Sequence, residues 1–459
     1  MGRTIQVTLA ANLTIHHPGP LLPHIIRMAR WRSKEGYAKR IVRLWRYDAQ
    51  ADTITVPRGL WPLPESWGSY KLDDQRLQLA PRSFRWRGPE LDAYQKRAAA
   101  RLVQCDGGPL LAPTGSGKTV MALRMIAAWR QPCLWIVHSE DLARYALDDA
   151  RAFFTLPHSA YGRVADGRCD PGTHFTVGLR QTLVHLPRSF FEAFGTVFVD
   201  ELDLSAARQH LRILSRCRAR YRAGGTATYE RTDGLHPVVT AMLGRARSEI
   251  TEDQAVAAGR FQRPIIRVRP TDRLYEWPGS WPALQRERAM DTGRNWLIAL
   301  DVAREFRQGH SCLVLVQLLE HVALMQQMLS AARVPAEEVT GQVDPEVRGR
   351  RIKLAARGGR CLIATKLINR GVNLPVVDRL FLADSYRSAP TVRQQIGRVT
   401  RTARGKLDAV VYDYWDRGPQ FEAQQRARLQ TYGDRGWELH LPEEIKAACR
   451  VFGPTRHRG

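Results

Sequence analysis

A glycine-rich segment that ends in lysine and threonine carries the strongest chemical signal in the sequence. Residues 112–119 read Ala-Pro-Thr-Gly-Ser-Gly-Lys-Thr and precede a helical pattern over 120–129. In such a loop the backbone N–H groups point at phosphate oxygens, and the helix N-terminus adds positive potential. Lys118 would neutralise the β- and γ-phosphates, and the Thr119 hydroxyl would hold Mg²⁺. The residues expected to cradle the phosphates of ATP are Thr114, Gly115, Ser116 and Gly117.

Two carboxylates follow a short apolar run further along the chain. Residues 197–199 read Val-Phe-Val and lead into Asp200 and Glu201. A carboxylate at the end of a buried strand is where nucleotide hydrolases hold their metal ion. Asp200 is therefore the candidate ligand of Mg²⁺, directly or through water, and Glu201 would polarise the attacking water. The alternative is a solvated acidic turn, which is the weaker interpretation beside a phosphate loop.

Two arginines near the end of the sequence have the spacing of one helical turn. Residues 394–401 read Gln-Gln-Ile-Gly-Arg-Val-Thr-Arg, so on a helix Arg398 and Arg401 would point the same way. An arginine that meets the charge building up on a transferred phosphoryl group is worth roughly 10³–10⁵ in rate. If these arginines and the phosphate loop lie on separate domains, hydrolysis requires the domains to close. A plain basic helix face is the alternative.

These groups need a scaffold, and the hydropathy pattern predicts one. Short apolar runs of the buried-strand type alternate with helical patterns, and they occupy residues 134–137, 196–199, 312–316 and 361–364. Strands that alternate with helices predict an α/β fold with parallel sheets flanked by helices. A stretch rich in Pro and Trp over 269–282 predicts the linker between two such halves.

Composition narrows the class of protein. The 459 residues hold 70 Lys and Arg against 45 Asp and Glu, a net charge of +25, which favours a polyanionic partner. A hydrophobic content of 44% with 25% charged residues is that of a globular protein. The seven cysteines form no Cys-x-x-Cys pair, and no run approaches the roughly 20 apolar residues of a membrane span. We expect a cytoplasmic protein of a bacterial or phage-infected cell.

Together with further motifs, these segments resemble the superfamily 2 helicases and translocases. Residues 91–98 are similar to the element of that family which reads adenine, and the resemblance places Gln95 on the base. Residues 137–142 fall where motif Ia lies. Residues 176–183 resemble the next motif that contacts nucleic acid, which implies that Arg180 and Thr182 contact it.

The remaining motifs of the resemblance lie further along the chain. Residues 224–234 resemble motif III of DNA-acting members, which implies coupling between the nucleotide and the nucleic acid through Thr226 and Thr228. Residues 364–375 resemble motif V, with Thr365 on the nucleic-acid backbone and Gly371 near the nucleotide, although Asn373 stands where the family usually has Asp. Motif VI covers 394–401; it implies Gln394 in the catalytic site and Arg398 and Arg401 as fingers on the γ-phosphate.

The resemblance implies two tandem RecA-like P-loop domains behind a small N-terminal α+β accessory domain, closest in motifs to the group of phage UvsW and eukaryotic XPB. The expected parts are an N-terminal DNA-binding domain at 1–80, RecA-like domains at 81–262 and 263–440, and a basic tail at 441–459.

The N-terminal region carries basic and aromatic residues in alternation. Between positions 25 and 47, Glu35 is the only acid among eight Arg and Lys residues, and four Trp and Tyr residues are interleaved. Cationic groups with aromatic rings suit phosphate contact plus base stacking. The candidates for nucleic-acid contact here are Arg32, Arg40 and Arg43. The alternative is a solvated basic face over a small core.

The sequence thus predicts an ATP- and Mg²⁺-dependent DNA helicase or translocase acting on single-stranded, duplex or branched DNA. An RNA helicase remains open, and so does an ATP-gated nucleic-acid-binding switch without processive motion. The motor of a restriction or nuclease system is disfavoured, because the sequence contains no convincing set of nuclease carboxylates.

Overall fold

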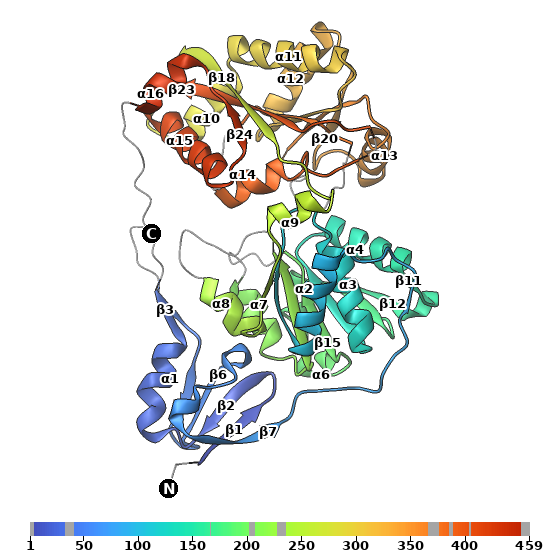
Figure 1. The fold of residues 1–459 in the computed structure, drawn as a ribbon, viewed down its shortest axis with the longest axis vertical. Coiled ribbons are helices and arrows are strands. Elements are labelled where there is room, and N and C mark those ends of the chain that lie inside the picture. The colour runs from blue at the N-terminus through green and yellow to red at the C-terminus, as the bar shows by residue number, and fades with distance from the viewer. Residues whose placement is uncertain are drawn as a thin grey trace. The chain divides into compact units, whose positions relative to one another are not determined.

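The computed structural model describes residues 4–32, 41–165, 167–201, 207–226, 236–365, 376–384, 389–403 and 405–450. The chain divides into two compact units, Met1–Gln254 and Ala255–Gly459 (Figure 1). The helix α9 (Glu252–Ala257) spans the division. Among the helices of the described ranges, none combines the length and the hydropathy that a bilayer span requires.

The first unit contains an eight-stranded sheet in the order β13-β12-β14-β10-β15-β16-β9-β17. Neighbouring strands are parallel except for the antiparallel pair β12 and β13. The strands are β9 (Gly107–Leu111), β10 (Cys133–Val137), β12 (Tyr161–Ala165), β13 (Arg168–Asp170), β14 (Phe175–Leu179), β15 (Thr196–Val199), β16 (Tyr221–Thr226) and β17 (Ser248–Glu249). A short ribbon of β8 (Arg85–Trp86) and β11 (Phe154–Thr155) lies outside this sheet.

Helices cover both faces of this sheet (Figure 1). Along β10 the residues Cys133, Trp135 and Val137 belong to one apolar core, and Leu134 and Ile136 belong to the other, as the two-residue period of a strand requires. Burial on both faces explains the continuous apolar run. The helices are α2 (Ala93–Gln104), α3 (Lys118–Trp129), α4 (Glu140–Phe153), α5 (Arg180–Leu183), α6 (Arg188–Phe191), α7 (Ala207–Leu214) and α8 (His236–Leu243).

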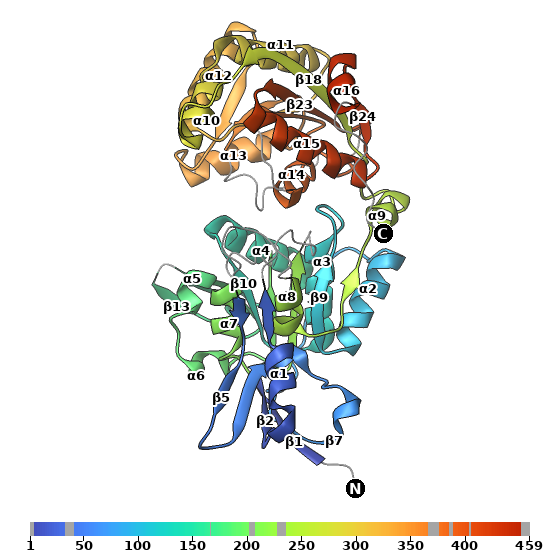
Figure 2. The same ribbon diagram turned by 90° about the vertical axis from the view of Figure 1, so that its left-hand side faces the viewer.

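An N-terminal sheet belongs to the same unit (Figure 2). Its strand order is β5-β6-β2-β1-β7, and the helix α1 packs against its core. The elements are β1 (Thr4–Leu9), β2 (Asn12–His16), α1 (Leu22–Met28), β5 (Arg46–Asp48), β6 (Thr53–Pro57) and β7 (Ser69–Asp74). A separate antiparallel ribbon of β3 (Arg30–Arg32) and β4 (Ile41–Arg43) carries the basic segment.

Two buried arginines hold the N-terminal sheet against the large sheet. Arg58 Nη1 donates to the carbonyl of Ala219 at 2.7 Å, and in the opposite direction Arg222 Nη2 donates to the carbonyl of Ala11 at 3.2 Å. Arg222 also donates to carbonyls at the C-terminal ends of α7 and α8, where the helix dipoles are negative. Gly59 lies so close to α8 that a Cβ atom would stand 2.2 Å from the Thr240 carbonyl oxygen.

The second unit contains a seven-stranded, all-parallel sheet in the order β20-β21-β19-β22-β23-β18-β24. The strands are β18 (Ile265–Leu274), β19 (Cys312–Leu315), β20 (Ala336–Val339), β21 (Cys361–Ala364), β22 (Arg379–Leu382), β23 (Val410–Arg417) and β24 (Glu438–His440). The helices are α10 (Trp281–Ala289), α11 (Thr292–Arg307), α12 (Leu319–Ala331), α13 (Pro345–Ala355), α14 (Ala389–Ile396), α15 (Pro419–Asp434) and α16 (Glu443–Arg450). Both sheets confirm the predicted α/β architecture.

The linker predicted over 269–282 is wrong, because its first part is strand and its last part is helix. Arg269 to Leu274 continue β18, which pairs with β23. Pro270 suggested a break, but it lies next to a register shift in the ladder, a place where proline is tolerated. Pro282 occupies the first turn of α10, where its missing N–H costs no hydrogen bond.

Candidate functional site

The glycine-rich loop connects the end of β9 to the start of α3. Gly115 and Gly117 have φ angles of 90° and 87°, in the left-handed region that favours glycine. The Ser116 side chain is buried, and its Oγ donates to the Pro113 carbonyl at 2.7 Å. The helix that follows begins at Lys118. The predicted phosphate loop therefore has the strand, turn and helix that phosphate binding requires.

Lys118 lies over this loop and close to the acidic residues. Its Nζ donates to the carbonyl of Ala112 at 3.0 Å. Its positive charge favours the ionised form of Asp200 and so lowers the pKa of that carboxyl, although other effects dominate. A Cβ atom on Gly225 of β16 would be 3.7 Å from the Lys118 side chain. Lysine, acid and β16 thus meet at the same edge of the sheet.

Asp200 stands directly after β15 and is half-buried. Burial raises the pKa of its carboxyl above the usual value, against the opposing effects of Lys118 and of the Glu201 N–H, which donates to Asp200 Oδ1 at 3.0 Å. The indole N–H of Trp135 also favours the ionised carboxyl. A desolvated carboxylate at this position favours a cation as its partner.

Glu201 points toward a histidine that sequence analysis did not select. His138 Nε2 lies 4.0 Å from Glu201 Oε2. The two residues follow neighbouring parallel strands, in which Ile136 is paired with Val199. The same register places His138 opposite Glu201, so knowing that β10 and β15 are neighbours would have identified the pair. Glu201 itself has a φ of 49°, which turns the chain sharply after the strand.

Gln95 lies against the phosphate loop. Its side chain is 5% exposed, and its Nε2 donates to the Ser116 carbonyl at 2.8 Å. At the other end of the same amide, Oε1 accepts from the backbone N–H of Asp92 at 2.9 Å, which caps the start of α2. The residue expected to read the base is therefore tied to the loop expected to hold the phosphates.

The donor set at this edge fits Mg²⁺. Thr119 offers a hydroxyl and Asp200 a carboxylate, which are the hard oxygen ligands that this ion takes when it keeps waters and phosphate oxygens in its other positions. The raised pKa of Asp200 is consistent with a carboxylate that a cation would stabilise. These two residues could hold the ion.

Thr226 ends β16 beside the phosphate loop. Its carbonyl accepts the N–H of Ala112 at 3.1 Å, so the start of motif III is joined directly to the start of the loop.

Arg180 and Thr182, both half-buried, begin the short α5 after β14. Arg32 and Arg43 are exposed on the ribbon of β3 and β4. Three other predicted residues lie outside the described ranges: Arg40, Thr228 and Gly371.

In the second unit, Thr365 is buried directly after β21, and Gln394 lies on α14. The prediction that Arg398 and Arg401 share a helix face is wrong, because α14 ends at Ile396. The N–H of Gly397 makes the last hydrogen bond of the α-helical type. The N–H groups of Arg398 and Val399 donate instead to carbonyls three residues earlier, on Gln395 and Ile396. Arg398 is buried in this turn, and Arg401 follows it in an isolated antiparallel bridge with Phe261.

A parallel sheet with a phosphate loop after β9 and a carboxylate pair after β15, with β16 between these two strands, defines a P-loop nucleotide hydrolase. Residues 88–231 match the family model described as type III restriction enzyme, res subunit, and residues 294–403 match the helicase conserved C-terminal domain. The two halves of the chain thus match domains of the superfamily 2 helicases, the chain is similar to the group that includes phage UvsW and XPB, and it is an ATP-hydrolysing enzyme.

Individual relatives agree with this assignment. The probable helicase D10 of Escherichia phage T5 is 24% identical over 400 residues, which cover 84% of each chain. The ATP-dependent DNA helicase uvsW of Enterobacteria phage T4 is 23% identical over 326 residues, 66% of this chain and 64% of that relative. The structure of S. cerevisiae Dbp5 bound to RNA and ADP BeF3 matches with a TM-score of 0.57 at 15% identity, over 79% of this chain and 93% of that one, and shows the shared fold.

Proposed function

We propose that the protein is a DNA helicase or translocase that uses Mg²⁺ and ATP. The observation that carries the proposal is the meeting of Lys118, Asp200 and Glu201 at one edge of the first large sheet, beside the phosphate loop. The relatives named as phage helicases support an action on nucleic acid, and the T4 relative is named for DNA. The net charge of +25 supports a polyanionic partner.

The residues of the first unit divide the chemistry between them. Lys118 and the loop N–H groups bind the phosphates of ATP. Thr119 and Asp200 would hold Mg²⁺, which neutralises charge on the β- and γ-phosphates. Glu201 orients the attacking water and receives its proton, and His138 at 4.0 Å helps to fix that carboxylate.

The second unit supplies positive charge for the transition state. Arg398 and Arg401 are proposed to meet the γ-phosphate when the two units close. Each cycle of ATP hydrolysis would then close the two units and open them again. The proposed contacts to the nucleic-acid strand are Arg180 and Thr182 of the first unit and Thr365 of the second. Arg32 and Arg43 extend this contact to the N-terminal ribbon.

The test measures ATPase rates of the full chain against single-stranded, duplex and branched DNA and against RNA. We expect stimulation by DNA, and loss of turnover in Lys118→Ala and Glu201→Gln, with ATP binding kept in the second variant. Arg398→Ala should still bind ATP, and its rate of ATP hydrolysis should fall by roughly 10³–10⁵-fold. The matched control is Lys96→Ala, which removes an exposed lysine on α2.

Three outcomes would contradict the proposal. If Lys118→Ala hydrolyses ATP as fast as the parent, the assignment of the ATP site is wrong. Stronger stimulation by RNA than by any DNA would assign the RNA helicase. A DNA-stimulated ATPase that displaces neither a duplex strand nor a triplex strand would assign the ATP-gated switch.

A further inference from the structure

Three consecutive carbonyl oxygens at the end of motif VI each accept a hydrogen bond from outside that motif. The carbonyls of Val399 and Arg401 accept from Nζ of Lys406, at 2.5 and 2.9 Å. The carbonyl between them, on Thr400, accepts from the backbone N–H of Gln262 at 2.7 Å. The main chain that carries Arg398 and Arg401 is therefore fixed residue by residue.

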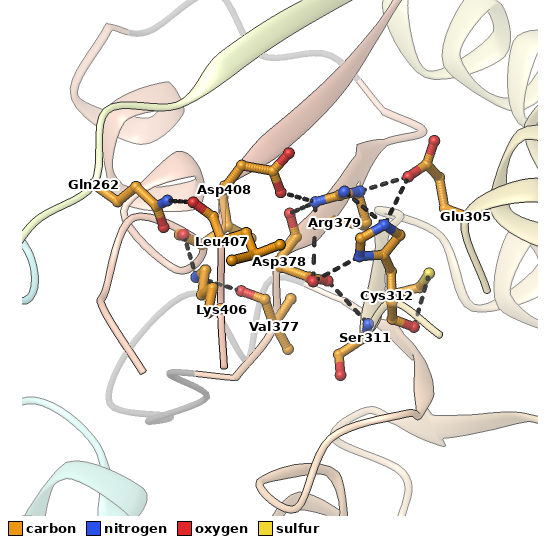
Figure 3. Close-up of polar contacts among 12 residues, drawn as sticks. Gln262, Glu305, Ser311, Cys312, Val377, Asp378, Arg379, Lys406, Leu407 and Asp408 are labelled. Carbon is orange, nitrogen blue, oxygen red and sulfur yellow. Dashed lines mark hydrogen bonds and ion pairs between the residues drawn. The ribbon is translucent and has the colours of Figure 1, made fainter. Parts of the chain in front are cut away.

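Lys406 also reaches the large sheet. Its Nζ donates to the carbonyl of Val377 at 2.7 Å, and Val377 is a buried residue just before β22. Figure 3 shows Lys406 beside Val377, with the residues of the neighbouring network around them. A protonated lysine has three N–H donors, and here three carbonyl oxygens accept them. The ammonium group thus joins the motif VI turn to the start of a central strand.

The turn that carries Lys406 is anchored in its own right. Asp408 accepts from Arg379 Nη1 at 2.5 Å, and Arg379 Nε donates to the buried Glu305 at 2.5 Å (Figure 3). The Leu407 carbonyl accepts from the side-chain amide of Gln262. Because its own backbone is held, Lys406 can position the residues it contacts.

The segment just before β18 holds motif VI from the other side. Phe261 forms an antiparallel bridge with Arg401, and the Thr402 hydroxyl donates to the Gly259 carbonyl at 2.7 Å. Arg401 therefore lies between a strap at residues 259–262 and the ammonium group of Lys406.

We propose that Lys406 is the positioning residue for the motif VI arginines, and for Arg401 in particular. The inference rests on the proposed function, in which these arginines meet the γ-phosphate. An arginine that stabilises a transition state must be held close to its working position, because a misplacement of about 1 Å can cost roughly 10²-fold in rate. The three carbonyl contacts supply that restraint without contact between Lys406 and the nucleotide.

The first test replaces the ammonium group and keeps the stem. Lys406→Met should lower kcat of the DNA-stimulated ATPase by about 10²-fold and leave KM for ATP within about twofold of the parent, because ATP binding resides in the first unit. Lys406→Arg, which keeps charge and donors, should recover most of the rate. The matched control is Lys353→Met, an exposed lysine on α13 of the same unit. Equal kcat in Lys406→Met and the parent would overturn the proposal.

A double-mutant cycle separates this inference from the proposed function. If Lys406 acts through Arg401, adding Lys406→Met to Arg401→Ala should change kcat by less than about twofold. Two effects that multiply would overturn the role of Lys406 in positioning Arg401. If Arg401→Ala alone keeps full activity, the proposed role of that arginine fails instead.

The alkaline pH profile tests the folded parent without removing the residue. Burial lowers the pKa of Lys406 to about 8, with Asp378 and Asp408 favouring the ammonium form and Arg379 and Arg401 opposing it. The neutral amine has two N–H donors and must release one of its three carbonyls. We expect kcat of the parent to fall above about pH 8 and kcat of Lys406→Arg to stay level. A shared alkaline fall in both proteins, or none in the parent, would contradict the proposal.

Discussion

The side-chain amide of Gln95 joins the start of α2 to the phosphate loop, since its Nε2 lies 2.8 Å from the Ser116 carbonyl oxygen and its Oε1 accepts the N–H of Asp92. The Ser116 carbonyl can only accept a hydrogen bond, and the Asp92 N–H can only donate one. A rotation of the amide that exchanged Nε2 and Oε1 would therefore lose both hydrogen bonds. The shape of the loop therefore depends on a residue from a separate helix, one that the family resemblance places on the base.

Gln95→Glu tests this dependence with almost no change of shape. The carboxylate keeps the acceptor for Asp92 and replaces the donor for Ser116 with a second oxygen, which the carbonyl repels. The Ser116 carbonyl would lose its donor at 2.8 Å and keep only the Tyr94 hydroxyl at 3.5 Å, and the loss of such a buried hydrogen bond costs about 1–3 kcal/mol. We expect KM for ATP to rise by roughly tenfold or more. Steady-state ATP titrations measure it, and Lys96→Ala, one residue along α2, should match the parent. An unchanged KM would show that the loop holds its shape alone.

Asp200→Asn should stabilise the nucleotide-free protein while it abolishes turnover. The folded state raises the pKa of Asp200, so the unfolded chain releases this proton at a lower pH than the folded chain does. As pH rises past the unfolded value the folded state therefore binds more protons, and the free energy of unfolding falls until the folded carboxyl has also ionised. At neutral pH the neutral asparagine avoids that loss.

Thermal scans without nucleotide or Mg²⁺ measure the effect of Asp200→Asn. We expect Tm to rise at pH 7.5 and the gain to vanish below about pH 4, where the parent carboxyl is also neutral. Asp148→Asn, at an exposed position on α4, should leave Tm unchanged. A lower Tm for Asp200→Asn at neutral pH would mean that the ionised carboxylate is stabilising.

Gly59→Ala should loosen the N-terminal sheet from the large sheet. The new Cβ atom would meet the carbonyl oxygens of Thr240 and Ala241 at 2.2 and 2.6 Å, and backbone atoms of a packed helix cannot move aside easily. Overpacking of this kind costs about 1–3 kcal/mol. Limited proteolysis should then cut the N-terminal region faster. In the second unit, Gly349→Ala on α13 adds a Cβ into open space and should raise stability. Unchanged proteolysis of Gly59→Ala would contradict close docking.

The salt dependence of DNA binding tests the exposed arginines on β3 and β4. Each phosphate contact contributes about −0.9 to the slope of log affinity against log salt on duplex DNA. Arg32→Ala and Arg43→Ala should each reduce the slope by about that amount. Fluorescence anisotropy with a labelled duplex between about 50 and 200 mM salt gives the slope. Lys71→Ala, at an exposed position on β7, is the control. If neither arginine changes the slope, the ribbon makes no contact with the DNA backbone.

The sequence by itself determined the chemistry that depends on neighbouring residues. The phosphate loop that ends at Lys118 and the pair of Asp200 and Glu201 could be predicted because a loop, its strand and its helix are contiguous in the chain. The alternation of apolar runs with helical patterns predicted the parallel sheets for the same reason. The motifs also placed Arg398 and Arg401 together, although the turn after Ile396 replaces the helix that the spacing suggested.

Only the tertiary structure decided which distant residues meet. Gln95 and Ser116, His138 and Glu201, and Lys406 and Val377 come together because of strand order and helix placement, which local patterns do not encode. Arg58 and Arg222 could not be paired by spacing, because each donates to carbonyl groups and not to a complementary side chain. Backbone carbonyls occur at every position, so sequence carries no mark of the ones a buried cation will find. The physical reason is that a hydrogen bond depends on distance in space, and folding brings together residues that the chain keeps far apart.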